Sequence, residues 1–289
     1  MVSPEQPEDA DEESGPPVAK SSRAGRNLPA AIGVGVTLGG IILATLLTVH
    51  QAFVGIVAAA VAAGSFELAG ALKHGGIRVA LPPVLAGGQA MVWLSWPFDR
   101  DGLVAAFGLT VLACLLWRLR GGAEGYLRDI GGSVFTAAYV PLFASFAAML
   151  AVPDDGAGRV LCFMIVVVVA DTGGYVSGVL LGKHPMAPKI SPKKTWEGFT
   201  GSLLAGMLAG WLSVTLLLEG HWWQGVLFGV AIGLTATLGD LMVSLVKRDL
   251  GVKDMGSLLP GHGGLMDRLD SLLPSAVVSW LLLGLFIPG

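Results

Sequence analysis

Apolar stretches of about 20 residues follow one another along most of this chain, and they constrain its fold more than any other feature. A helix needs roughly that length to cross the hydrocarbon core of a bilayer, where only helices and closed barrels satisfy every backbone hydrogen bond. We therefore expect an all-α, polytopic integral membrane protein with about nine transmembrane helices. The expected spans are about 28–49, 51–72, 79–97, 103–117, 133–152, 160–182, 196–218, 223–246 and 271–287.

The composition supports a single membrane-embedded domain. Of the 289 residues, 53% are hydrophobic and the mean hydropathy is +0.71, which excludes an ordinary soluble domain. We expect the membrane domain to cover residues 28–289. Residues 1–27 are rich in Pro, Glu, Asp and Ser and lack a core-forming pattern, so we expect a disordered cytoplasmic tail there. Cys114 and Cys162 lie inside apolar stretches, which indicates packing rather than a disulfide framework or a thiolate metal site.

The positions of the 18 Lys and Arg residues orient the expected helices. Cytoplasmic loops of membrane proteins carry an excess of these residues. With nine spans, all of them except Arg100 and Arg159 fall on the same side of the membrane as the amino terminus. We therefore expect the amino terminus inside, the carboxyl terminus outside, and the two richest polar loops facing the cytoplasm.

The densest polar window runs from Asp240 to Asp270, in a chain where only 13% of residues are charged. If the preceding apolar stretch is helical, Asp240, Ser244 and Lys247 fall at i, i+4 and i+7 and share one face. A carboxylate and a hydroxyl suit a hard cation such as Mg²⁺, while basic side chains suit the phosphate oxygens that this cation bridges. Asp267 and Asp270 follow one helical turn apart. The window therefore predicts a site that binds metal and phosphate.

One long motif lies within this window. Its residues are Ser244, Lys247, Arg248, Lys253, Asp254, Gly256, Leu259, Pro260, His262, Gly263, Gly264, Asp267, Arg268 and Asp270. Position for position, it resembles the signature of the phosphatidate cytidylyltransferases, the CDP-diacylglycerol synthases of membranes. The competing interpretation is an ordinary solvated loop between two membrane helices.

A second polar stretch, just before the seventh expected span, contains three lysines and two hydroxyls. Such a loop beside a helix amino terminus could hold a triphosphate through charge, hydroxyl groups and free backbone N–H groups. A basic membrane-flanking loop with Thr195 as helix cap explains the same residues equally well. Residues 191–198 resemble the other motif of the same family, as do residues 171–175, where Gly174 stands in place of alanine. The resemblance favours nucleotide binding.

Two acidic residues fall within expected spans. Asp171 lies in the middle of the sixth, where an ionised carboxylate is costly and usually faces a polar cavity with a function. The adjacent Gly173 and Gly174 are expected to let the helix break beside that cavity. Glu67 lies near the cytoplasmic end of the second span, where it could act in the site, pair with Lys73 or reach water.

The resemblance implies an enzyme that transfers a cytidylyl group from CTP to phosphatidate, giving CDP-diacylglycerol and pyrophosphate. Mg²⁺ is the expected cofactor, with Asp240 and Asp267 as its ligands, and a second cation is left open. A structural alternative has these aspartates form ion pairs with Lys247 or Arg268 that stabilise the hairpin of the last two spans. The expected catalytic residues are Asp171, Asp240, Lys247, Arg248, Asp267 and Asp270. The expected substrate-binding residues are Ser191, Lys193, Lys194, Thr195, Glu197, Ser244, Lys253, Asp254, His262, Gly263, Gly264 and Arg268.

The expected partners are CTP, phosphatidate in the bilayer and membrane lipid, with no nucleic acid. Small residues on the helix faces would also permit a homodimer. The site is expected in a cytoplasm-facing polar cavity of a multi-pass protein of a bacterial-type cell (inner) membrane. Two alternative functions stay open. One is a CTP-dependent nucleotidyltransferase acting on another lipid phosphate, and the other is a membrane transporter, although no repeated half is found and the polar residues gather on one side.

Overall fold

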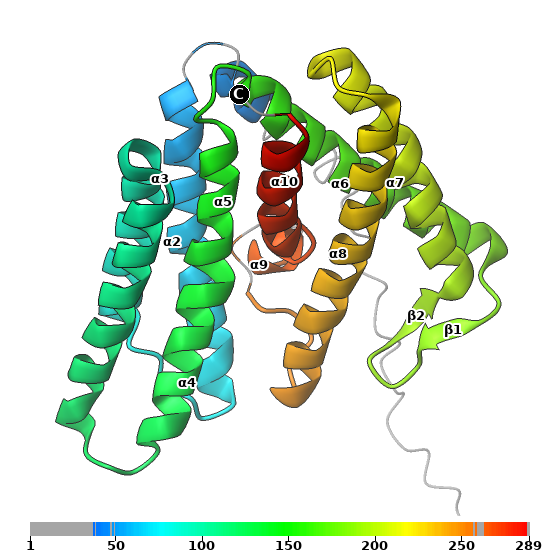
Figure 1. Ribbon diagram of the computed structural model, residues 1–289. Helices are drawn as coiled ribbons and strands as arrows, with labels where there is room; N and C mark the ends of the chain where they lie inside the picture. Colours follow the sequence, from blue (N-terminus) through cyan, green and yellow to red (C-terminus); the bar gives the residue numbers. More distant parts are fainter. Residues whose placement is uncertain are drawn as a thin grey trace, which may run out of the picture.

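The computed structural model describes residues 37–287, apart from 38, 47, 49, 257 and 259–262. These residues form a bundle of long helices with one short β-hairpin (Figure 1). Within the described part, seven segments are long and apolar enough to cross a membrane, so the chain is an all-α, polytopic membrane protein, as predicted. They are Ala52–His74, Leu81–Gly121, Tyr126–Leu150, Gly156–Leu181, Trp196–Leu217, Trp222–Asp249 and Met266–Phe286.

The predicted tail, residues 1–27, lies outside the described residues, as does most of the first predicted span, of which residues 39–46 are helical. The further helical elements are α2 (His50–His74), α3 (Leu81–Arg118), η1 (Leu119–Gly121), α4 (Tyr126–Ala137), η2 (Ala138–Leu142, a π-helix), α5 (Phe143–Leu150), α6 (Gly156–Leu181), α7 (Trp196–Leu217), α8 (Trp222–Asp249), α9 (Met266–Leu269) and α10 (Leu272–Phe286).

Helix α3 consists of two arms joined by a sharp bend. Asp99 has φ 47° and ψ −133°, which is not helical. Beyond the bend the chain folds back, so that Gly87 faces Thr110 and a Cβ added at Gly87 would collide with the threonine side chain. The predicted spans 79–97 and 103–117 correspond to the two arms.

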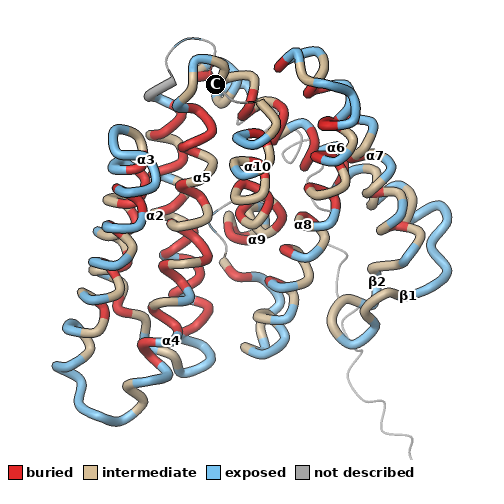
Figure 2. The backbone as a smooth tube through the Cα atoms, in the orientation of Figure 1, coloured by how far each residue is buried: buried red, intermediate tan, exposed pale blue. Residues whose placement is uncertain are grey.

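The helices form two groups with α10 between them (Figure 1). Helices α2 to α5 lie on one side and α6 to α8 on the other, and α10 packs against both α5 and α8. Figure 2 shows that buried residues gather where helices face one another, while many outward positions are exposed. Exposed leucines on α7 and α8, such as Leu204, Leu216 and Leu238, give these helices the apolar outer surface that contact with lipid requires.

Glycines let α7 and α8 approach backbone to backbone. Gly206 faces Gly229, and Gly210 faces Gly225, so that a Cβ added at any of the four would meet a backbone oxygen of the facing helix. Helices in a bilayer associate through such close packing, because lipid tails are as apolar as the side chains. These contacts make α7 and α8 one closely packed unit.

The predicted break in the sixth span is wrong, because α6 remains helical from Gly156 to Leu181. Gly173 and Gly174 make room for α7 instead. A Cβ added at Gly174 would lie 3.1 Å from Ser202 Cβ and 3.3 Å from the Gly198 carbonyl oxygen. A glycine pair inside a bilayer can thus serve close packing and leave every helical hydrogen bond intact.

A β-hairpin that the sequence did not predict precedes α7. It consists of β1 (Pro185–Ala187) and β2 (Ser191–Thr195), which pair antiparallel. Thr195 ends β2 and caps α7, because its side-chain oxygen accepts a hydrogen bond from the Gly198 N–H at 3.1 Å. The helix cap that the alternative interpretation gave Thr195 is confirmed, and it fixes the lysines of β2 directly in front of α7.

We predict that Gly229→Ala lowers thermal stability. The new Cβ would meet the backbone of Gly206, which cannot rotate away, and overpacking of this kind costs about 1–3 kcal/mol. Gly108→Ala is the matched control, because nothing lies within 4 Å of a Cβ at Gly108 in α3. Melting of both purified variants in detergent checks the prediction. Equal melting temperatures would contradict the close contact of α7 and α8.

Candidate active site

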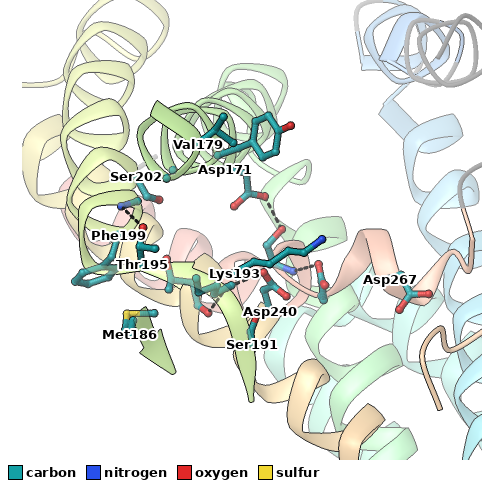
Figure 3. A pocket seen from close by; sticks show the side chains of 18 of the residues that line it. Asp171, Val179, Met186, Ser191, Lys193, Thr195, Phe199, Ser202, Asp240 and Asp267 are labelled. Atoms are coloured by element: carbon teal, nitrogen blue, oxygen red, sulfur yellow. Dashed lines mark hydrogen bonds and ion pairs between the residues drawn. The ribbon is translucent and has the colours of Figure 1, made fainter. Parts of the chain in front are cut away.

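A pocket of about 650 Å³ lies where α6, the hairpin, α7, α8 and the residues before α10 meet (Figure 3). Both polar stretches contribute to its lining. Of the predicted site residues, it is lined by Asp171, Ser191, Lys193, Lys194, Thr195, Asp240, Lys247, Asp254, Asp267, Arg268 and Asp270.

An ion pair joins the two polar stretches inside this pocket. Lys194 Nζ lies 2.6 Å from Asp240 Oδ2 and also donates to the Thr237 carbonyl oxygen at 3.3 Å. The other oxygen of Asp240 accepts a long hydrogen bond from the Ser244 hydroxyl, at 3.4 Å. The side chain of Lys194 is 21% exposed and that of Asp240 is 41% exposed, so an anionic ligand in the pocket could compete for the ammonium group. Lys247, the partner that the structural alternative gave Asp240, binds a different aspartate.

Asp267 is held by groups on both sides of the loop that precedes it. Its Oδ1 accepts a hydrogen bond from Lys247 Nζ at 2.8 Å. Its Oδ2 accepts the backbone N–H of Met255 at 3.1 Å and that of Gly264 at 3.3 Å. The ion pair between Asp267 and Lys247 is one that the structural alternative predicted.

Two further carboxylates line the pocket near the start of α10. Ser271 donates its hydroxyl to Asp171 Oδ2 at 2.9 Å, and its backbone N–H to Asp270 Oδ1 at 2.8 Å. Asp171 is exposed although it lies in the middle of α6, because it faces this pocket. Asp171, Asp240 and Asp270 are close enough to interact electrostatically. Mutual repulsion makes this wall of the pocket receptive to cations.

The acidic groups can be compared with what Mg²⁺ requires. Among the described residues, no group of three or more His, Cys, Asp or Glu side chains is arranged to hold a metal ion. Mg²⁺ typically takes only one or two protein carboxylates and fills its other positions with water and substrate phosphate. Asp240 and Asp267, the predicted ligands, line one pocket and fit that donor set, although each also binds a lysine. A cation would therefore share each carboxylate with an ammonium group.

Several predicted site residues lie away from the pocket lining. They are Glu197, Ser244, Arg248, Lys253, Gly263 and Gly264. His262 lies outside the described residues.

Two of these residues fix the hairpin. Glu197 accepts hydrogen bonds from the backbone N–H groups of Lys183 and His184, both at 3.2 Å, and its Oε1 lies 2.6 Å from His184 Nδ1. Arg248 donates from Nε to the carbonyl oxygen of Ile190, at 3.3 Å, in the turn of the hairpin. They tie the segment before β1 to α7 and the hairpin turn to α8.

The pocket also contains residues that the sequence did not single out. Thr237 contacts Lys194 and lies one helical turn before Asp240, and Ser271 contacts Asp171 and follows Asp270 directly. Their spacing from predicted residues could have identified both. The others form a partly apolar wall with no polar signal in the sequence. They are Gly178, Val179, Met186, Phe199 and Ser202. Gly174, Tyr175 and Gly198 also line the pocket, and they belong to the motifs of residues 171–175 and 191–198.

The class of protein follows from comparison with known families. Residues 29–286 match the family model described as the cytidylyltransferase family, and the chain belongs to that family. It is similar, more particularly, to proteins named phosphatidate cytidylyltransferase. The chain is 53% identical to the one from Mycobacterium leprae over 279 residues, which cover 91% of this chain and 89% of that protein. For the protein from Mycobacterium bovis the identity is 51% over 282 residues, covering 93% and 92%. The resemblance found in the sequence is confirmed.

Proposed function

We propose that this protein transfers a cytidylyl group from CTP to phosphatidate, releasing pyrophosphate and forming CDP-diacylglycerol. Family membership and the names of the relatives support this reaction. The structural observation that carries it is the ion pair between Lys194 and Asp240, which lies where the two polar stretches meet in one pocket. A pocket with lysines, carboxylates and an apolar wall suits a reaction between a soluble polyanion and a lipid phosphate.

For this reaction the protein chiefly has to align the two substrates and neutralise the charge of their phosphate groups. A phosphate oxygen of phosphatidate attacks the α-phosphorus of CTP, and the bond from that phosphorus to the oxygen shared with the β-phosphate breaks. The electron pair leaves with pyrophosphate. The attacking oxygen is already anionic and needs no strong general base, so most of the catalysis comes from positioning and electrostatic stabilisation.

We assign the CTP phosphates to β2 and the start of α7. Lys193 and Lys194 supply positive charge there, and Ser191 and Thr195 supply hydroxyl groups. Thr195 lies at the helix amino terminus, where unpaired N–H groups favour anions. Binding of a triphosphate would draw Lys194 from Asp240 and free that carboxylate.

We assign the lipid phosphate to the opposite wall, where Lys247 and Arg268 line the pocket. Tyr175 and Val179 line the apolar wall and are 73% and 66% exposed, which suits the glycerol and the first carbons of the acyl chains. Arg248 was predicted to bind phosphate, and its contact with the hairpin supports a role in holding the donor strand.

Mg²⁺ is the proposed cofactor, with Asp240 and Asp267 as ligands. When bound, it would neutralise phosphate charge as a Lewis acid beside the reacting phosphorus. Asp171 and Asp270 complete the acidic wall, and Ser271 orients both through its hydroxyl and its N–H.

We also propose nine spans with the pocket on the cytoplasmic side. The first predicted span, α2, the two arms of α3 and the five later segments give this count. Lysine and arginine on the loops at the pocket end favour a cytoplasmic position. The protein would then lie in the cell (inner) membrane with its carboxyl terminus outside.

Purified protein supplied with labelled CTP and a panel of lipid phosphates tests the function. We expect thin-layer chromatography to show a labelled lipid that migrates as CDP-diacylglycerol, together with an equal amount of pyrophosphate. Faster turnover of another lipid phosphate would favour the alternative substrate class. Movement of a solute into liposomes without CTP consumption would favour a transporter.

Replacing Lys193 or Lys194 by Ala should raise the KM for CTP more than the KM for phosphatidate. Each change removes a cation from the proposed triphosphate site and leaves the lipid side of the pocket intact. Lys189→Ala is the matched control, because Lys189 lies in the turn of the same hairpin and outside the pocket lining. Unchanged CTP kinetics in both pocket variants would show that these lysines do not bind CTP, and would favour the interpretation of the hairpin as a basic membrane-flanking loop.

Asp240→Asn should keep the melting temperature of the protein, lower turnover by orders of magnitude and raise the Mg²⁺ concentration needed for activity. The Asp240 side chain is 41% exposed, and its charge attracts Lys194 but repels Asp171 and Asp270, so loss of that charge should change stability little. Asp267→Asn should show the same metal effect with a lower melting temperature, because its single acceptor oxygen cannot serve both Lys247 and the backbone N–H groups of Met255 and Gly264. A normal Mg²⁺ titration in both variants would refute the metal role.

A further inference from the structure

Glu67 of α2 is a buried acid with long-range partners. Its side chain is among the buried polar groups, at 5% exposure, so the interpretation in which it reaches water is wrong. Its Oε1 accepts the backbone N–H of Leu258 at 3.2 Å, and its Oε2 accepts that of Met266 at 2.8 Å. These bonds span 191 and 199 residues of sequence. Its hydrogen bonds thus go to the loop before α9 rather than to Lys73.

Two glycines make room for this carboxylate. A Cβ added at Gly264 would lie 2.9 Å from Glu67 Oε2, and one added at Gly256 would overlap the side chain of Glu67 itself. Main-chain donors and glycines thus face the same acid from both ends of the loop. Buried carboxylates are stable only when their oxygens are hydrogen-bonded, and hydrogen bonds to a charged acceptor are about twice as strong as neutral ones.

The loop held by Glu67 leads directly into the pocket. Met266 is the first residue of α9, and the next two residues, Asp267 and Arg268, line the pocket. Asp267 in turn binds the N–H groups of Met255 and Gly264. The loop therefore has two carboxylate anchors, one of its own and one from α2, which packs against α9 (Figure 1).

We propose that Glu67 is a positioning residue for the transfer reaction: its carboxylate fixes the backbone before α9 and so sets Asp267 and Arg268 in the pocket. This inference rests on the proposed function. It also makes α2, which contributes nothing to the pocket lining, part of the support of the site.

Glu67→Gln tests the role of the carboxylate at constant size. An amide has only one acceptor oxygen, so its NH₂ group would face a backbone N–H and one of the two hydrogen bonds is lost. We expect faster hydrogen exchange at whichever of the Leu258 and Met266 amides loses its acceptor, with exchange in α7 unchanged. Glu124→Gln, the same change at an exposed residue, is the control and should leave hydrogen exchange at Leu258 and at Met266 unchanged.

Kinetics separate positioning from a loss of folded protein. Misplacement of catalytic groups by about 1 Å can cost about 100-fold, so we expect Glu67→Gln to lower kcat/KM for phosphatidate by roughly 10- to 100-fold. The KM for CTP should stay near its normal value, because the donor lysines stand on β2. A fall in kcat alone, in proportion to the folded fraction and with both KM values unchanged, would overturn the proposal.

A double-mutant cycle tests the contact itself. Gly256→Ala should impair activity in the normal protein, where the new methyl group meets the acid, and should add little in a Glu67→Ala background, where that space is empty. Additive effects would overturn the proposal, as would normal exchange of Leu258 and Met266 in Glu67→Gln. Absence of any transfer by the normal protein would instead refute the proposed function, since the exchange measurements do not depend on activity.

Discussion

Backbone hydrogen bonding in an apolar solvent is the constraint on which this structure depends. An unpaired N–H or C=O inside a bilayer costs several kcal/mol, so the spanning segments are helices. The irregular parts around the pocket solve the same problem with side chains that accept backbone N–H groups. Thr195 and Glu197 serve the hairpin and the start of α7, and Asp267 and Glu67 serve the loop before α9. The backbone N–H groups of these non-helical segments beside the pocket thereby find acceptors.

The ion pair between Lys194 and Asp240 has a different role from these acceptors. Its side chains are 21% and 41% exposed, and ion pairs that contact water contribute only about 0–1 kcal/mol, so other contacts contribute more to the position of the hairpin. The Thr195 cap and the contacts of Glu197 and Arg248 do so. The pair instead lets the charges of Lys194 and Asp240 neutralise each other while the pocket holds no ligand. In the proposed reaction, a bound ligand would replace one of the two partners. The weakness of the ion pair suits the proposed reaction, in which both partners would change contacts.

Much of the fold could be predicted from the sequence, because apolar length and the two motifs are local signals. The two arms of α3 correspond to two separate apolar stretches, and both motifs contribute to one pocket. Thr195 was identified as a cap from its place before a helix. The hairpin was missed because β1 and β2 are too short to give a periodic pattern. The break at Gly173 was wrong because hydropathy does not reveal which neighbouring helix a glycine meets.

The contacts of Glu67 lay beyond prediction for a similar reason. Its partners are main-chain N–H groups, which every residue except proline carries, so no residue type marks them. The motif of the last two spans contains Gly256 and Gly264, yet nothing local says that an acid from α2 fills the space they leave. Sequence motifs describe one side of such a contact. The other side becomes visible only when the chain is folded.

Recognition of main-chain groups also determines which substitutions the loop can tolerate. Leu258 contributes its N–H to Glu67, while its own side chain is 51% exposed. Most replacements at this position would keep the donor and so preserve the geometry of the anchor. Proline is the exception, since it has no N–H to donate. The anchor can therefore persist while the side chain at position 258 diverges, which separates the evolution of that exposed position from the geometry of the site the loop supports.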